Sequence, residues 1–243
     1  MGETARLRLF PLNTVLFPGA VLNLHIFEDR YRRMIAECLD SGEAFGVVLI
    51  REGGETGDPD VAPYDVGTTA EIRDVTPLPA GRYYITTTGG RRFRIARIVD
   101  REPFLVADVA FLEDGSDHDE EGRAAELTER LTREFREYVE LLVAFSGSSA
   151  KIDLPSDPVG ASYVVGDALQ VADGLKQRLL ELQTAEARLA AELGFLRRLL
   201  PQLRSLLQRK RLQERAVRAH APREGGEFRA HQEKFFGKHF SLN

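Results

Sequence analysis

Apolar and polar residues alternate in several stretches of the first half of the chain, a pattern typical of strands with one buried face. Within Val21–Ile26, three apolar residues at even positions alternate with Val21, Asn23 and His25. Further strands are predicted at Leu7–Leu12, Ala44–Ile50, Thr68–Val75, Gly81–Thr88, Arg91–Val99 and Phe104–Leu112. Arg91–Val99 alternates in the same way, Ala44–Ile50 is a nearly continuous apolar run, and Gly81–Thr88 is rich in aromatic and β-branched residues. Between Gly81–Thr88 and Arg91–Val99, Gly89-Gly90 predicts a tight turn and therefore a hairpin. Glu52–Gly67 is rich in Gly and Pro and is expected to be a loop.

Elsewhere the apolar spacing changes to three and four residues, which is typical of amphipathic helices. One helix is expected to begin at Glu28-Asp29, because carboxylates favour the first turn. Beyond residue 122 four more are predicted, one ending near Gly147, one capped by Asp157 and running towards Leu169, one around Leu175–Leu182 and a long one capped by Thr184. Pro201 is expected to kink or divide the last helix, because it lacks a backbone donor.

These patterns predict an α+β chain in four parts. A β-rich part is expected over residues 1–112, an acidic linker over 113–122, a helical bundle over 123–208 and a basic tail over 209–243. The tail carries a net charge of +5, whereas each preceding part is net negative.

Several strings of residues resemble one family. Phe17-Pro18-Gly19, followed seven residues later by Ile26-Phe27-Glu28, resembles the start of the LON domain, the N-terminal substrate-binding domain of Lon proteases. Further similar strings are G-x-R-R-F-R-I at 89–95, Asp157-Pro158, K-Q-R-L-L-E at 176–181 and E-A-R-L at 186–189. The resemblance covers roughly residues 7–200 and departs at Ala187 and in the tail. It implies a PUA-like open β-barrel with one or two helices, followed by a helical bundle with a long kinked last helix.

Motifs for catalysis or metal binding fail on spacing. No G-x-x-x-x-G-K-[ST] phosphate loop occurs, and Ser149 lacks the second Gly of G-x-S-x-G because Lys151 stands there. Asp117–Gly122 resembles the first half of a calcium loop, but Thr128 stands where a bidentate Glu is needed. His220, His231 and His239 are too widely spaced for a zinc site. We therefore expect no catalytic residues, no cofactor and no metal, in a stand-alone LON-domain protein without the ATPase and protease modules.

Composition adds few constraints. The 243 residues are 43% hydrophobic and 29% charged, which is typical of globular proteins. No apolar run approaches the roughly 18 residues that cross a bilayer, and the N-terminus has no signal-peptide pattern. The single Cys38 excludes an internal disulfide. A cytoplasmic location without membrane contact is expected.

The resemblance implies a non-enzymatic module that binds unfolded or exposed polypeptide segments. Such a module acts as an adaptor or protein-quality-control factor, in partnership with a separate protease, and is expected to be a monomer or weak dimer. The predicted peptide contacts are Phe17, Pro18, Tyr64, Arg92 and Phe93.

The alternative is nucleic-acid binding, through the barrel or the basic tail. Arg91, Arg92, Arg94 and Arg97 lie near Tyr83, Tyr84 and Phe93, residue types that together stack and neutralise single-stranded RNA. Nearby carboxylates such as Asp74 and Asp100 weaken this interpretation, so polypeptide binding is preferred.

Overall fold

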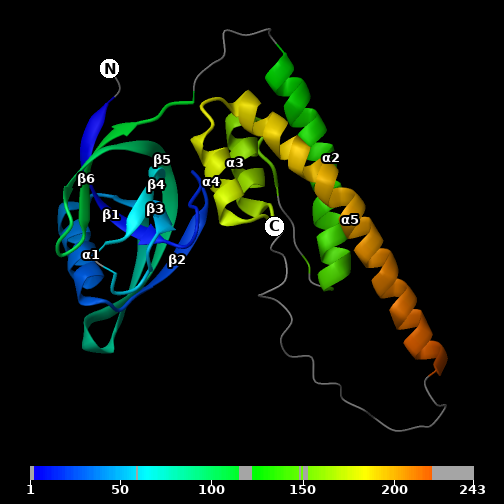
Figure 1. The fold of residues 1–243 in the computed structure, drawn as a ribbon, viewed down its shortest axis with the longest axis horizontal. Coiled ribbons are helices and arrows are strands. Elements are labelled where there is room, and N and C mark those ends of the chain that lie inside the picture. The colour runs from blue at the N-terminus through cyan, green and yellow to red at the C-terminus, as the bar shows by residue number, and fades with distance from the viewer. Residues whose placement is uncertain (1–2, 59, 115–121, 148, 150–152, 221–243) are drawn as a thin grey trace.

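The computed structural model describes residues 3–58, 60–114, 122–147, 149 and 153–220. Figure 1 shows a β-rich lobe on one side and a helical lobe on the other, with α2 and α5 extending away from the sheet. The predicted α+β class is therefore confirmed. The boundaries expected at residues 113–122 and 209 stay predictions, because residues 115–121 and 221–243 lie outside the described residues.

The β-rich lobe is one six-stranded mixed sheet. Its strands are β1 (Thr4–Leu12), β2 (Val21–Ile26), β3 (Phe45–Glu52), β4 (Ala62–Leu78), β5 (Arg82–Asp100) and β6 (Leu105–Phe111). Their order is β2-β5-β4-β3-β1-β6, with β1 and β3 parallel and the other neighbours antiparallel. Because β5 also pairs with β6, the sheet curls back towards itself. Strand β2 stays at one end of this order.

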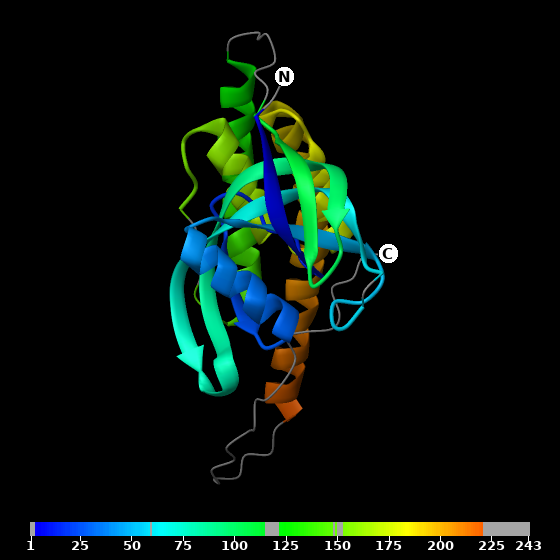
Figure 2. The same cartoon turned by 90° about the vertical axis from the view of Figure 1, so that its left-hand side faces the viewer.

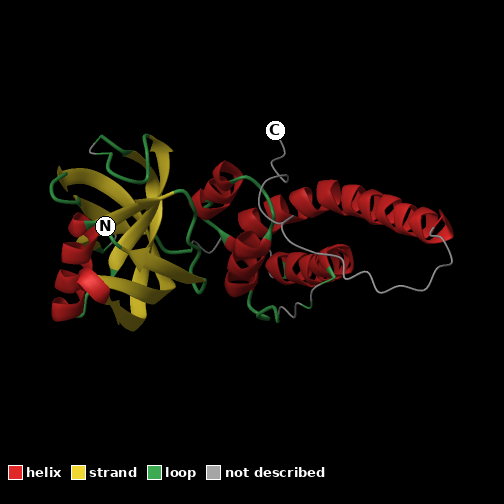
Figure 3. Cartoon of the chain, turned by 90° about the horizontal axis from the view of Figure 1, so that it is seen from below, coloured by secondary structure: helices red, strands yellow, loops and turns green. Residues whose placement is uncertain are grey.

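Helix α1 (Asp29–Ser41) covers one part of the sheet, on the side away from the helical lobe (Figure 3). Its buried residues Tyr31, Met34, Ile35 and Cys38 follow the helical spacing of three and four. They form a core with strand residues such as Phe10, whose ring centroid lies 4.0 Å from that of Tyr31.

The predicted hairpin at Gly89-Gly90 is wrong, because β5 runs without interruption from Arg82 to Asp100. Both glycines lie inside the strand, where a side chain would clash with neighbouring atoms. A Cβ at Gly89 would lie 2.1 Å from the Phe17 carbonyl oxygen, and one at Gly90 would lie 2.6 Å from Thr69 Oγ1. The Gly89 amide donates to the Ala20 carbonyl at 2.8 Å, so the F-P-G turn packs directly on β5.

The true hairpin joins β4 and β5 through a short 3-10 turn at Pro79–Gly81. Ala80 and Gly81 adopt left-handed backbone conformations there, with φ of 63° and 66°. In Figure 2 this hairpin extends past the end of α1. The predicted loop also ends early, because β4 already starts at Ala62.

The helical lobe contains α2 (Arg123–Ser146), α3 (Pro158–Ala168), α4 (Asp173–Glu181) and α5 (Ala185–His220). The predicted caps are confirmed: Asp157 Oδ1 accepts from the Gly160 amide at 2.7 Å, and Thr184 Oγ1 from the Ala187 amide at 3.2 Å. Gly147 ends α2 with a φ of 72°. Pro201 does not divide α5, and the ribbon bends gradually in Figure 3. None of the described helices has the length and apolarity that a membrane span requires.

One apolar core joins the two lobes. The sheet lobe contributes Phe17, Leu49 and Val66, and the helical lobe contributes Phe135 and Leu189 among others. Gly166 on α3 leaves room for the Phe17 ring, because a Cβ there would lie 2.9 Å from the ring. The lobes are thus held together by continuous packing.

Candidate functional site

The exposed side of β2 and its neighbour β5 carries an unusual group of side chains. Alternation turns the even-numbered residues of β2 towards the α1 core and leaves Val21, Asn23 and His25 exposed. Val21 is 63% exposed, Phe27 49% and Tyr84 52%, which is high for apolar side chains of this size. We call this surface the β2 face; it consists of Val21, Asn23, His25, Phe27, Tyr84 and Thr86.

Three aromatic rings meet on the β2 face. His25 and Tyr84 are partners across the β2–β5 pair, and their ring centroids are 4.7 Å apart. The Phe27 ring lies 5.6 Å from that of His25. Aromatic side chains supply large contact area for a partner, and Tyr and His add polar groups that orient it.

Two rows of side chains cross strands β2, β5 and β4, and the second row contains two of these rings. Asn23, Thr86 and Asp74 form one row, and His25, Tyr84 and Thr76 form the next. Together they line an open cavity of about 390 Å³. Thr86 Oγ1 donates to Asn23 Oδ1 at 2.9 Å, which fixes the amide at one wall of the cavity.

The edge of β2 that faces away from β5 is available for pairing with a further strand. Within the described residues, the backbone of β2 pairs with β5 alone. Since Ala20 accepts from Gly89 and antiparallel ladder bonds recur at every second residue, the even-numbered residues of β2 face β5. The N–H and C=O groups of Val21, Asn23 and His25 therefore face away from β5, on the residues whose side chains form the β2 face.

Two of the sequence-predicted contacts, Phe17 and Phe93, lie inside the protein. Both are 0% exposed. The Phe17 ring packs in the core between the lobes, 6.4 Å from that of Tyr163. Phe93 fills the space left by Gly46 and Gly67, where a Cβ would approach its ring to 2.6 and 2.8 Å. A ligand at the surface of this conformation cannot contact either ring, so these placements do not fit a peptide contact.

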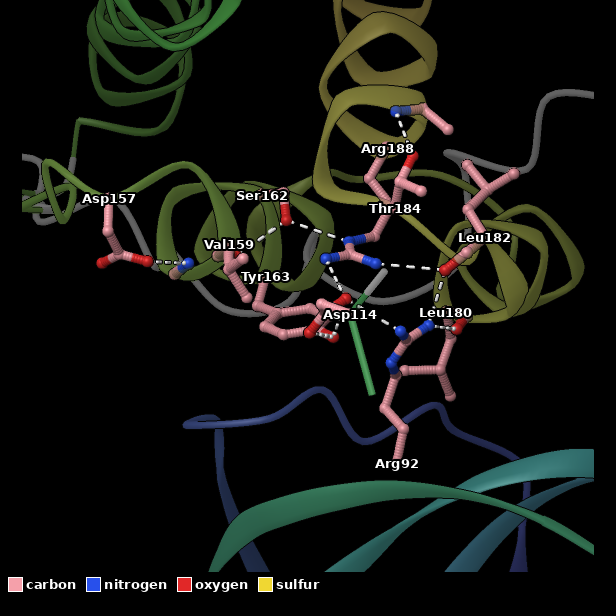
Figure 4. A network of polar contacts seen from close by, with 12 residues as sticks. Arg92, Asp114, Asp157, Val159, Ser162, Tyr163, Leu180, Leu182, Thr184 and Arg188 are labelled. Carbon is pink, nitrogen blue, oxygen red and sulfur yellow. Dashed lines mark hydrogen bonds and ion pairs between the residues drawn. The ribbon is translucent and has the colours of Figure 1, made fainter. Parts of the chain in front are cut away.

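Arg92, the third predicted contact, is also buried and belongs to a polar network between the lobes (Figure 4). From β5 its guanidinium donates to the carbonyls of Leu180 at 2.7 Å and Leu182 at 2.6 Å. Its Nη2 atom also donates to Asp114 at 2.8 Å. Burial lowers the pKa of Arg92, an effect that the charge of Asp114 partly offsets. Arg92 therefore joins the lobes, and its side chain does not reach the surface.

The network continues from Asp114 into the helical lobe. Asp114 forms an ion pair with Arg188 Nη2 at 2.6 Å and accepts from the Tyr163 hydroxyl at 2.7 Å. Arg188, which is 0% exposed, donates in turn to Ser162 Oγ at 2.9 Å. The guanidinium lies 4.3 Å from the centre of the Tyr163 ring. Burial raises the pKa of Tyr163, so its hydroxyl stays a donor.

The remaining two predicted contacts, Pro18 and Tyr64, are partly exposed and lie in different parts of the fold. Pro18 is in the turn that leads into β2, directly before Gly19, whose φ is 80°. Tyr64, near the start of β4, packs against the core between the lobes. Of the five residues, only Pro18 borders the β2 face along the chain.

Unlike Asp114, one buried carboxylate has no hydrogen-bond partner among the described residues. Glu192 on α5 is 0% exposed, and neither of its carboxylate oxygens has a hydrogen-bond partner among the described residues. Burial raises its pKa well above the ordinary value, although the nearby charge of Arg188 acts in the opposite direction. The folded protein therefore holds a proton on Glu192 at pH values where the unfolded chain has released it.

Replacing this carboxyl is expected to change how stability depends on pH. As pH rises above 4.5, the unfolded state binds fewer protons than the folded state, so the wild type loses stability until the folded pKa is reached. Glu192→Gln removes this loss, and the difference in free energy of unfolding, variant minus wild type, grows by about 1.4 kcal/mol per pH unit in that window. Urea titrations at several pH values measure it. Glu140→Gln, an exposed change on α2, is the control; equal slopes for both variants contradict the prediction.

The β2 face was only partly visible in the sequence. Alternation placed His25 on the polar side of its strand, and Tyr84 entered only as an RNA-stacking residue. Their contact depends on the pairing of β2 with β5, and the mistaken hairpin obscured that pairing. Asp74, considered only as a neighbouring negative charge, lines the same cavity.

The other chemical motifs give no site in the described structure. Within the described ranges, no three His, Cys, Asp or Glu residues come close enough to hold a metal. Most of the acidic run 117–122, together with Ser148, Lys151, His231 and His239, lies outside the described residues.

Comparison with known proteins agrees with the sequence strings. Residues 6–198 match the model of the ATP-dependent protease La (LON) substrate-binding domain. Lon protease of Anaeromyxobacter dehalogenans is 28% identical over 197 residues, which cover 80% of this chain and 23% of that protein. Lon protease 2 of Myxococcus xanthus is 28% identical over 195 residues, covering 79% and 23%.

Solved structures show the same relationship. The crystal structure of a Lon N-terminal domain protein from Xanthomonas campestris aligns with a TM-score of 0.58 and 28% identity, covering 78% of this chain and 98% of that one. The N-terminal domain of Mycobacterium avium complex Lon protease aligns with a TM-score of 0.57 at 19% identity, which shows similarity of fold alone.

The chain thus belongs to the Lon substrate-binding domain family, as the F-P-G and I-F-E strings predicted. It spans less than a quarter of the length of the two Lon proteases, 23% of each. The family model is described as a substrate-binding domain.

Proposed function

We propose that this protein binds exposed segments of other polypeptides, and that the β2 face together with the open edge of β2 is the binding surface. The observation that carries the proposal is the coincidence of unpaired backbone groups and exposed aromatic rings on the same residues. His25 supplies both: its backbone faces away from β5, and its ring lies between Phe27 and Tyr84.

An open strand edge suits a ligand without fixed structure. An extended segment that adds to β2 would satisfy the outward N–H and C=O groups whatever its sequence. Its alternate side chains would then lie beside the aromatic rings, which favour apolar and aromatic residues. Backbone pairing supplies affinity and the rings supply a broad preference, which is what a receptor for many unfolded chains requires.

In this proposal the chain contributes recognition and carries out no reaction of its own. Folded proteins satisfy their backbone groups internally, whereas unfolded segments expose both these groups and apolar side chains. A surface that reads these two features distinguishes damaged from native chains. We therefore propose a role in protein quality control, as an adaptor that presents such segments to a separate protease. Pro18, next to the edge, is retained as a flanking contact, and the role of Tyr64 stays a prediction.

Removing the Tyr84 ring is expected to weaken polypeptide binding. Tyr84→Ser deletes an exposed aromatic group from the β2 face without touching the core, and we expect the Kd for a reduced, alkylated and therefore unfolded model protein to rise about tenfold. Fluorescence anisotropy measures the Kd, and circular dichroism verifies the fold. Val99→Ser is the matched control, because Val99 is an exposed apolar residue on β5 beyond its pairing with β2.

Two results would contradict the proposal. If wild-type protein shows no affinity for the unfolded chain, the function itself is wrong. If Tyr84→Ser and Val99→Ser bind equally well, a polypeptide is bound at another surface. Binding of the native form of the same model protein serves as the specificity control, because its backbone groups are already paired.

RNA binding is a second candidate, and one observation favours it. Arg209, Arg211 and Arg215 are exposed near the described end of α5, and among the described residues no ion pair engages them. If these arginines contact phosphates, affinity for single-stranded RNA falls steeply with added salt and falls further in a triple Gln variant. Salt-insensitive or undetectable binding removes this candidate.

A further inference from the structure

The cavity beside the β2 face has a chemical character that suggests which side chains of a bound segment it selects. Its walls are not uniformly apolar: the rings of His25 and Tyr84 lie at one end, and the carboxylate of Asp74 lies in the neighbouring row. Leu24 and Ile85 also line the cavity. The cavity therefore combines aromatic surface with one negative charge.

Asp74 is available to a ligand. Among the described residues, no cation lies within ion-pair distance of its carboxylate. The adjacent Arg73 is engaged elsewhere, since its Nη2 atom donates to Glu71 at 2.6 Å. Asn23 Oδ1 is likewise occupied by the Thr86 hydroxyl. Asp74 is thus the charged acceptor of the cavity, and its natural complement is a cationic donor.

The side chain that meets both features is arginine. Its planar guanidinium stacks on aromatic faces and pairs with carboxylates, and its aliphatic stem is long enough to reach into an open cavity from a segment lying on the face. Tyr84 and Asp74 sit diagonally across the β4–β5 pair, an arrangement within reach of one long side chain. The charge is also complementary, because the acidic wall attracts the cation and repels carboxylates.

We propose that this cavity is a specificity pocket for an arginine side chain of the bound polypeptide, with Asp74 as the residue that determines the preference. The inference rests on the proposed function, because it concerns the same surface. Exposed segments that place an arginine among aromatic residues are then preferred over otherwise equal segments without it.

The test uses two synthetic peptides that differ at one position. One carries arginine among aromatic residues, and the other carries citrulline, which has almost the same shape without the charge. At low salt we expect the wild type to bind the arginine peptide about tenfold more tightly, from the sum of stacking and ion pairing. In Asp74→Asn the ion-pair share is lost and this ratio should fall to about threefold, the share that stacking of the cation retains, while the affinity for the citrulline peptide stays unchanged.

Asp65→Asn is the matched control, because Asp65 is an exposed carboxylate on β4 outside the cavity and the change in net charge is identical. If Asp65→Asn lowers the ratio as much as Asp74→Asn, general charge attraction explains the preference and the pocket is excluded. A ratio that Asp74→Asn leaves unchanged overturns the inference as well. If neither peptide binds the wild type, the proposed function fails before the pocket is reached, so the two failures are distinguishable.

Discussion

Asp114→Ala is expected to lower the free energy of unfolding by about 3–5 kcal/mol, the loss typical of breaking a buried ion pair from one side. Asp114 contacts both Arg92 and Arg188, which are 2% and 0% exposed. Without the carboxylate, two buried guanidinium groups lose the ion-pair partner that they share within the described residues. The Tyr163 hydroxyl loses its acceptor at the same time.

Chemical denaturation measures this loss, and Asp108→Ala is the control. Asp108 also pairs with two arginines, Arg6 and Arg97, but on the surface of the sheet. Water and salt compensate for such a change, so little effect on the denaturation midpoint is expected. Equal midpoints for the two variants would show that the network between the lobes does not stabilise the fold.

Gly89→Ala is expected to destabilise the protein by about 2–3 kcal/mol, although it adds a single methyl group. The new Cβ would lie 2.1 Å from the carbonyl oxygen of Phe17, a backbone atom that cannot rotate away. The F-P-G turn must then separate from β5, which disturbs the hydrogen bond between Gly89 and Ala20 and the burial of Phe17.

Gly194→Ala provides the comparison for this substitution. A Cβ at Gly194 meets nothing within 4 Å, and the residue lies inside α5. Alanine is favoured over glycine in helices by about 1 kcal/mol, so this variant should gain stability. A Gly89→Ala protein as stable as the wild type would instead support an exposed turn at Gly89-Gly90, the hairpin that the sequence predicted.

Local patterns in the sequence were sufficient for most of the secondary structure. The alternation at Val21–Ile26 predicts the bounds of β2, and the Asp157 and Thr184 caps place the starts of α3 and α5. These signals depend on contacts within a few residues along the chain. Gly89-Gly90 misled the prediction because two glycines favour a turn, while the structure needs them for close contacts with residues far away in sequence, Phe17 at Gly89 and Thr69 at Gly90.

The site was harder to predict, because its residues come together only through strand pairing. Arg92 looked like part of an exposed basic cluster, since a charged residue on a strand is usually solvated. Its partner Asp114 lies in the predicted linker, and nothing local shows that both are buried. Conversely, His25 and Tyr84 are ordinary residues on separate strands until the β2–β5 pairing places their rings 4.7 Å apart.

Amide hydrogen exchange in the presence of an unfolded model protein tests the central claim most directly. If a segment adds to the open edge of β2, the outward-facing amides of Val21, Asn23 and His25 should become protected on binding, while the exchange of α2 and α5 stays unchanged. Protection that appears in the helical lobe with no change in β2, under conditions where binding is saturated, would contradict the account.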